Sequence, residues 1–255
     1  MSGRNVPPEV PQASLAGEVN LAGCMGSVVR MPNARLRDPA LLLTNGHCVQ
    51  GTKPAPGKAL VDQPASFAVG VDDHDGYAGA TANATRLVYA TMTGTDVAIY
   101  RLDKTYAQLA AEHATLFTLS TKPMSTNEKV DVLSGVHRQP CTVQAIVPHL
   151  REGGYQLDDA ARGTNTDTCG LFPGMSGSPM LAKDGNTVVG VHNTSDQGTD
   201  KPCTDNNPCE VAADGSVTSV TGRAYGEQID MIPGCFTKGS LLDLNREGCT
   251  LTKSV

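Results

Sequence analysis

The sequence has no tryptophan, and only 4% of its 255 residues are aromatic. A buried core must therefore be built mainly from Val, Leu, Ile and Ala. No run of about 18 apolar residues occurs, so the sequence predicts no membrane-spanning helix. Hydrophobic residues still make up 39% of the chain and charged residues 18%, which is typical of a soluble globular protein that can bury a core.

Basic clusters are also missing, and the net charge is -6. Nucleic-acid binding depends on neutralising phosphates, so this charge argues against a nucleic-acid partner. The same absence gives no support for an anchor to an anionic membrane surface. The start of the chain lacks an apolar signal-peptide region, so we expect that no signal peptide is present in this chain.

No CxxC pair occurs among the eight cysteines. Zinc sites usually show closely spaced ligand pairs, so disulfides are the better interpretation and no metal site is expected. Disulfides persist in oxidising compartments, which predicts a secreted, extracellular protein. The cysteines are Cys24, Cys48, Cys141, Cys169, Cys203, Cys209, Cys235 and Cys249.

Short apolar segments of strand length dominate the chain, each bounded by Gly, Pro, Asn or Asp. They form two successive series of about six, which predicts an all-β protein of two six-stranded antiparallel β-barrels packed side by side. We expect an extended leader over 1–20, the first barrel over 21–120, the second over 121–233 and a disulfide-stapled tail over 234–255. One short helix is expected over 106–113, between the barrels.

Ser176 is set between two glycines in the segment Leu171-Phe-Pro-Gly-Met-Ser-Gly-Ser-Pro179. A serine is a poor nucleophile unless a base takes its proton and backbone donors stabilise the oxyanion. Gly174 and Gly177 would allow a tight turn that aims the N–H groups of Gly174 and Ser176 at one point. The alternative is a plain surface turn, because Gly, Ser and Pro dominate turns.

Two further local motifs precede this serine. His47 follows a predicted buried strand and is followed directly by a cysteine, and Asp96 opens the apolar segment Asp96-Val-Ala-Ile-Tyr-Arg-Leu102. Alone, a histidine is more often structural and an acid at a strand start is usually a turn acceptor. The order His47, Asp96, Ser176 is much more specific than any single motif.

Together the three motifs resemble the chymotrypsin-like (trypsin-fold) serine proteases, over about residues 20–232. In that family a cysteine follows the histidine, the aspartate opens an Asp-Val/Ile-Ala-Leu strand, and the serine lies in Gly-x-Ser-Gly-x-Pro. The resemblance implies that His47 is the general base, Asp96 orients it, Ser176 attacks, and the amides of Gly174 and Ser176 form the oxyanion hole. It implies hydrolysis of protein or peptide substrates through an acyl-enzyme, with no cofactor, by a monomer.

The sequence fits two alternative protein classes less well, and it lacks one feature of trypsin itself. An α/β-hydrolase fails because Ser178 stands where its turn needs glycine, and because its acid and histidine would follow Ser176. The trypsin activation switch, which pairs an acid before the serine with a freed N-terminus, is not expected because Met175 is uncharged. A catalytically weak binding or adhesion module on the same fold remains the second hypothesis, although all three triad residues are present.

The segment after the serine resembles the bacterial glutamyl endopeptidases of the staphylococcal V8 type, in which a histidine matching His192 helps to bind a P1 glutamate. This predicts an S1 pocket (the site of the P1 side chain) with Leu171, His192 and Arg223, although His192 could instead be structural and Arg223 solvated. Leu171 argues against acidic P1 specificity, because those relatives carry a hydroxyl residue there. Gly170, where trypsin keeps its acid, argues against Lys or Arg at P1.

Disulfide pairing is only partly fixed by these patterns. The resemblance assigns Cys24 to Cys48, closing the histidine loop. The other suggested pairs are Cys141 with Cys169, Cys203 with Cys209 and Cys235 with Cys249. Pairing of Cys169 with Cys203 is an alternative.

Two weaker motifs complete the sequence. Asp72-Asp-His-Asp75 is interpreted as a solvated turn, because its spacing matches no calcium-binding loop. Glycosylation sequons begin at Asn83 and Asn193, and a glycan on Asn193 would obstruct the predicted pocket.

Overall fold

In the computed structural model, residues 14–133, 138–163, 169, 174–198 and 201–253 are described. Strands dominate them, and the α-helix they contain is α1 (Tyr106–Ala111), close to the predicted 106–113. Thr105 caps α1 through a capping box with Gln108, which explains why the helix begins directly after a strand. No helix in the described ranges is long and apolar enough to cross a membrane. The all-β prediction is confirmed.

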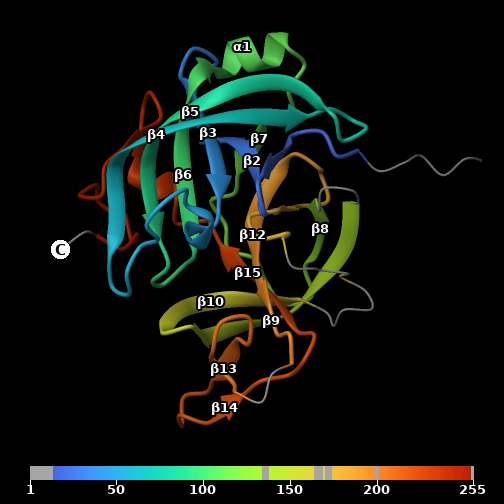
Figure 1. Cartoon of the computed structure of the whole chain (residues 1–255), viewed down its shortest axis with the longest axis vertical. Coiled ribbons are helices and arrows are strands. Elements are labelled where there is room, and N and C mark those ends of the chain that lie inside the picture. Colours follow the sequence, from blue (N-terminus) through green and yellow to red (C-terminus); the bar gives the residue numbers. More distant parts are fainter. Residues whose placement is uncertain (1–13, 134–137, 164–168, 170–173, 199–200, 254–255) are drawn as a thin grey trace, which may run out of the picture.

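The first six strands form a closed ring (Figure 1). Their order is β1-β4-β5-β6-β3-β2, and β1 also pairs with β2, which closes the ring. Its first strand lies partly inside the expected leader, because Val19 and Leu21 alternate into the core. The strands are β1 (Glu18–Leu21), β2 (Cys24–Arg30), β3 (Pro39–Thr44), β4 (Ala59–Asp72), β5 (Ala78–Thr91) and β6 (Val97–Thr105).

A second closed ring follows in the order β12-β11-β8-β9-β10-β15, with β12 paired to β15. Its strands are β8 (Lys129–Leu133), β9 (Arg138–Glu152), β10 (Tyr155–Gly163), β11 (Pro179–Leu181), β12 (Thr187–Ser195) and β15 (Ala224–Gln228). The short strand β7 (Phe117–Leu119) pairs in parallel with β2 and with β12, and so joins the two rings (Figure 1).

Four shorter strands lie outside the rings. The hairpin β13 (Cys209–Val211) and β14 (Val217–Thr218) extends the sheet from β9. β16 (Phe236–Thr237) and β17 (Leu241–Leu242) form a small separate sheet in the C-terminal tail, after the 3-10 turn Pro233–Cys235.

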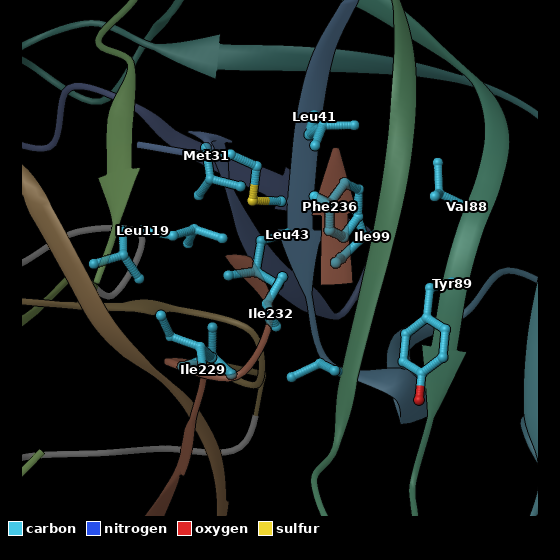
Figure 2. Close-up of a cluster of buried hydrophobic side chains, with 14 of the residues drawn as sticks. Met31, Leu41, Leu43, Val88, Tyr89, Ile99, Leu119, Ile229, Ile232 and Phe236 are labelled. Atoms are coloured by element: carbon cyan, nitrogen blue, oxygen red, sulfur yellow. The ribbon is translucent and has the colours of Figure 1, made fainter. Parts of the chain in front are cut away.

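One hydrophobic cluster runs through both rings and the tail. Leu43 and Ile99 of the first ring share it with Val191 of the second, with Ile232 after β15 and with Phe236 of the tail. Figure 2 shows the tail side chains packed against those of the first ring. The cluster fixes the rings to each other, so loops contributed by either ring keep a constant spacing.

The low aromatic content predicts an aliphatic core, but the core of the structure also contains aromatic side chains. Tyr89, Tyr100, Tyr106 and Tyr225 are almost fully buried. Their hydroxyls keep polar partners, and Tyr106, for example, donates to the carbonyl of Val29 at 2.8 Å. The few aromatic residues therefore fill the largest core positions without leaving an unpaired hydroxyl.

Four disulfides hold the chain, and they match the suggested pairs rather than the alternative between Cys169 and Cys203. They are Cys24–Cys48, Cys141–Cys169, Cys203–Cys209 and Cys235–Cys249. The segment Asp72–Asp75 lies at the β4–β5 turn, where the Asp73 side chain accepts from the backbone N–H groups of Asp75 and Tyr77.

Candidate active site

A cleft of about 710 Å³ receives residues from both rings. The first ring contributes His47 and Asp96, and the second contributes Ser176 and His192. His47 lies in the 3-10 turn Gly46–Cys48 directly after β3, and Asp96 directly precedes β6. Because β3 and β6 are paired neighbours, the loop at this end of each strand must meet the other.

The Asp96 carboxylate binds both the side chain and the backbone of His47. Imidazole Nδ1 lies 2.7 Å from one Asp96 carboxylate oxygen, and the His47 backbone N–H donates to the other at 3.0 Å. A carboxylate accepts only, so Nδ1 carries the proton and Nε2 of the neutral ring is left as an acceptor. Burial lowers the pKa of His47, but the Asp96 charge and hydrogen bond outweigh burial and raise that pKa overall.

Asp96 is in turn fixed by its surroundings. It is only 3% exposed, and its backbone carbonyl accepts a hydrogen bond from Asn45 Nδ2 at 2.7 Å. Gly46 has no side chain because a Cβ there would overlap the carbonyl of Thr91 and press on the Asp96 carboxylate. The segment around His47 is therefore shaped to admit the acid behind the imidazole.

Ser176 sits on a turn that only glycine can flank. Gly174 and Gly177 have φ of +96° and +89°, in the left-handed region that glycine favours. A Cβ at Gly177 would also overlap the Met25 carbonyl and the Thr44 hydroxyl. The predicted tight turn is present, and it presents Ser176 to the cleft.

Two backbone donors on this turn are unused. The neighbouring amides are engaged: Gly177 N–H donates to the His192 carbonyl and Ser178 N–H to the Met175 carbonyl. Among the described residues, the N–H groups of Gly174 and Ser176 have no intramolecular acceptor, although both residues line the cleft. Such free donors beside a hydroxyl could stabilise a developing negative charge.

The Ser176 hydroxyl is engaged elsewhere in this structure. It donates to the backbone carbonyl of Asn193 at 3.0 Å, and no hydrogen bond joins it to His47 in the described residues. The Ser176 backbone nevertheless lies against Cys48, the neighbour of His47, whose sulfur is 3.8 Å from the Ser176 carbonyl. In this structure the Ser176 hydroxyl hydrogen is therefore directed at Asn193 and not at His47.

A model of the trypsin-like peptidase domain matches residues 24–191. The chain belongs to the trypsin-like peptidase family. No curated protein matches the sequence.

Two solved structures with TM-scores above 0.5 have the same fold as this trypsin-like peptidase chain. The MamO protease domain from Magnetospirillum magneticum is 15% identical, with a TM-score of 0.51, over 88% of this chain and 97% of that one. Kallikrein-related peptidase 10 is 13% identical, with a TM-score of 0.51, over 87% and 94%. A Glu endopeptidase is 18% identical, with a TM-score of 0.47, over 87% and 88%.

His192 lines the cleft of this trypsin-like peptidase chain but carries no charge near neutral pH. It is 3% exposed, and burial together with the nearby His47 lowers its pKa to about 4. A hydrogen bond with the Tyr225 backbone acts in the opposite direction and raises that pKa, but it is the smaller effect. Its backbone N–H donates to the carbonyl of Ser178, which ties β12 to the serine turn.

Of the other predicted S1 residues, Arg223 is described and is not brought to the cleft, while Leu171 and the neighbouring Gly170 lie outside the described residues. Arg223 lies outside the cleft lining, and its guanidinium donates to Glu210 at 3.2 Å. Glu210 also binds Arg162 and the Tyr225 hydroxyl, so the Arg223 charge is already paired.

Glu152 lines the cleft and was missed in the sequence. It ends β9, and one carboxylate oxygen accepts from the Thr194 hydroxyl at 3.0 Å and from the Asn206 N–H at 2.7 Å. Burial is the main cause that raises its pKa. An acid before the turn Gly153-Gly154 looks like any solvated turn residue, so sequence alone offered no signal.

A second residue that the sequence analysis missed, Glu227, lies on β15 and contacts Asp96. Every residue of the segment Ala-Tyr-Gly-Glu-Gln in β15 is buried, and Glu227 is 0% exposed. It accepts from Asn193 Nδ2 at 2.8 Å. The Asn193 amide is thus buried and bonded, which leaves no room for a glycan on that sequon.

The cluster Cys24, His47 and Cys48 has the spacing of a metal site within the described residues. Its two sulfurs form a disulfide with each other, and the thiolate is the form that binds metals. These residues therefore do not fit a metal ion.

Proposed function

We propose that the protein is a secreted serine endopeptidase that uses His47, Asp96 and Ser176. The observation that carries the proposal is the 2.7 Å contact between His47 Nδ1 and Asp96 in the cleft that Ser176 lines. In acyl transfer these three residues would act as base, orienting acid and nucleophile, and the N–H groups of Gly174 and Ser176 would supply the donors that stabilise the oxyanion.

The reaction begins when the Ser176 hydroxyl leaves the Asn193 carbonyl and turns to His47. His47 Nε2 takes the hydroxyl proton while Oγ bonds to the substrate carbonyl carbon, and the free N–H groups of Gly174 and Ser176 hold the oxyanion. The imidazolium, stabilised by Asp96, then protonates the leaving amine as the peptide bond breaks. A water, deprotonated by His47, hydrolyses the acyl-enzyme and restores Ser176.

The substrate would lie along β12. Pairing of β12 with β11 ends at Val191, and Thr194 and Ser195 pair with β15 on their other side. Both residues line the cleft, so their edge that faces away from β15 is available to an extended peptide. Backbone hydrogen bonds to such an added strand would bind the substrate with little regard for its sequence.

We propose that the P1 side chain contacts His192 and that acidic side chains are preferred. A carboxylate beside a neutral, buried imidazole favours its protonated form, so binding would occur with proton uptake. This specificity rests on His192 alone, because Arg223 is bound to Glu210. It predicts that KM for acidic P1 peptides falls as the pH decreases, while KM for neutral P1 peptides does not.

The extracellular location is supported by four disulfides, which persist in oxidising compartments. A monomer is proposed with it, since the cleft draws residues from both rings of a single chain.

The test is cleavage of an unfolded protein and of a P1-diverse peptide library by the wild type and by Ser176→Ala. Cleavage by the wild type that Ser176→Ala loses would support an endopeptidase. Intact substrate after long incubation with folded wild type would refute it and favour a binding module. Preferred cleavage after apolar or basic residues would refute the acidic P1 specificity.

A further inference from the structure

The Glu227 carboxyl, which takes no part in the reaction outlined above, touches both sides of the proposed catalytic centre. One of its oxygens accepts from the backbone N–H of Asp96 at 3.2 Å, and the other accepts from Asn193 Nδ2 at 2.8 Å. Asp96 comes from the first ring and Asn193 from the second. Glu227 therefore connects the two rings directly behind the cleft.

Each contact leads on to a reacting group. Asp96 is the partner of His47, and the Asn193 carbonyl accepts the Ser176 hydroxyl. Glu227 is thus linked to the proposed base through one intervening residue, Asp96, and to the proposed nucleophile through another, Asn193. Loss of either contact would change the distance between the Ser176 hydroxyl and His47 Nε2, over which the proton is transferred. Small errors in such a distance lower the catalytic rate strongly.

A carboxyl is an expensive group to place here if its role is only to fill space. It is 0% exposed and lies beside another buried acid. Burial of an acid costs free energy unless its oxygens are hydrogen-bonded, and a packed apolar side chain often stabilises a fold more. Two N–H donors that face the same group explain why a side chain with two oxygen atoms occupies the position, one oxygen toward each donor.

Charge couples Glu227 to its neighbours as well. Burial and then the negative charge of Asp96 raise the pKa of Glu227 to about 8, and hydrogen bonds from Asn193, Asp96 and Thr95 oppose the rise. Beyond Asp96 stands His47, and His192 on the adjacent strand β12 is neutral. Glu227 would therefore be protonated near neutral pH and would add a negative charge behind Asp96 in alkaline solution.

We propose that Glu227 is a positioning residue, which holds the Asp96 backbone and the Asn193 side chain in register and so fixes the His47–Asp96 pair relative to Ser176. The inference rests on the proposed peptidase function for its kinetic consequence. Its structural consequence, control of the His47 environment, can be measured without any substrate.

The test uses Glu227→Gln, which keeps the size of the side chain and has no charge. In the amide an NH₂ group replaces one of the two carboxyl oxygens, so the N–H donor that faced that oxygen, from Asp96 or from Asn193, loses its acceptor. We expect kcat to fall about tenfold or more while KM stays within about twofold, because substrate contacts are unchanged. Glu210→Gln is the matched control, since Glu210 also anchors three side chains of the second ring but lies outside the cleft.

A second readout is the titration of His47, followed by NMR of the ring protons. Wild type should show the His47 titration with a further inflection near pH 8 from Glu227, and Glu227→Gln should lack that inflection. If wild type cleaves no peptide, the endopeptidase proposal fails while this titration still tests Glu227. The titration and the kinetics therefore separate the two failures.

Equal kcat in Glu227→Gln and wild type, or equal losses in Glu227→Gln and Glu210→Gln, would overturn the inference. So would a His47 titration that Glu227→Gln leaves unchanged. If Glu227→Gln does not fold, Asn193→Ala takes its place, because it removes the donor to Glu227 and keeps the backbone carbonyl. A lower kcat with KM retained then supports the proposal, and an unchanged kcat contradicts it.

Discussion

The Ser176 hydroxyl and the Asn193 carbonyl oxygen are hydrogen-bonded at 3.0 Å, so the candidate nucleophile rests on the second ring rather than on His47. A neutral hydrogen bond of this kind is worth about 1 kcal/mol net, which thermal motion readily supplies. The Ser176 hydroxyl can therefore leave the Asn193 carbonyl at a small cost in free energy. Catalytic hydrogen bonds are often incomplete until substrate arrives.

The fall in activity at low pH should reflect the protonation of His47. The base must be neutral to accept the Ser176 proton, and Asp96 raises the His47 pKa above its ordinary value of 6.5. We therefore expect kcat/KM to fall as the pH decreases, with a midpoint above 6.5, in assays of a neutral P1 peptide. A flat profile between pH 5 and 8 would contradict His47 as the base.

Asp96→Asn should lower kcat by about 10³-fold or more, because the amide no longer selects the Nδ1–H tautomer of His47. Asp158→Asn is a suitable control, since Asp158 also pairs with a histidine, His149, at 2.8 Å but lies outside the cleft. Steady-state kinetics should show near wild-type kcat for the control. Similar kcat for both variants would rule out an orienting role for Asp96.

Gly177→Ala should destabilise the protein and abolish cleavage. The new Cβ would strain a residue with φ +89° and would overlap the Met25 carbonyl and the Thr44 hydroxyl. Gly215→Ala is matched in backbone strain, with φ +82°, but its Cβ meets open space. Thermal unfolding should show a loss of about 1 kcal/mol for Gly215→Ala and several for Gly177→Ala. Equal losses would mean that the close contact at Gly177 is unimportant.

Replacing Cys24 and Cys48 by alanine should reduce both stability and activity. Loss of a disulfide typically costs about 2–4 kcal/mol, and Cys48 is adjacent to His47 and contacts the Ser176 backbone. The matched variant removes Cys235 and Cys249 in the tail and should lose stability with little change in kcat. Denaturant unfolding and kinetics on both variants would separate the effects, and an equal loss of kcat would count against a local role.

Glu227 should make the wild type less stable in alkaline solution. Its pKa is about 8 when folded, and its ordinary value of 4.5 applies when unfolded. Between these values the folded state holds a proton that the unfolded state releases, so the free energy of unfolding falls as pH rises, by about 1 kcal/mol per pH unit. The free energy of unfolding is measured with denaturant for the wild type and for Glu227→Gln. The difference between the two should show this slope between pH 5 and 8. A difference that does not vary with pH would contradict a buried, proton-binding Glu227.

The sequence predicts much of this architecture because each signal is local. Strand-length apolar segments mark the two rings, and glycine at Gly174 and Gly177 marks a turn whose φ values need it. The contact between His47 and Asp96 is expected only from the resemblance of their local motifs to those of the chymotrypsin-like serine proteases. Four tyrosines in the core were not foreseen, because composition gives the amount of aromatic residue but not its location.

Long-range partners explain what the sequence misses. The position of Arg223, two residues before Tyr225, predicts that it lies near the pocket. Its guanidinium instead pairs with Glu210, which lies 13 residues earlier in the chain. Glu227 gives only the faint signal of an acid in an apolar strand, and its partners Asp96 and Asn193 lie 131 and 34 residues away in sequence. Such contacts depend on how the strands pair, which local patterns do not specify.

Covalent labelling of Ser176 tests the central claim most directly. Folded wild type is incubated with a fluorophosphonate probe, and the modified residue is located by mass spectrometry beside Ser176→Ala and His47→Ala. A single adduct on Ser176, absent in Ser176→Ala and strongly reduced in His47→Ala, is the predicted result. Folded wild type that remains unlabelled, or that is labelled equally well without His47, would contradict the assignment of Ser176 as an activated nucleophile.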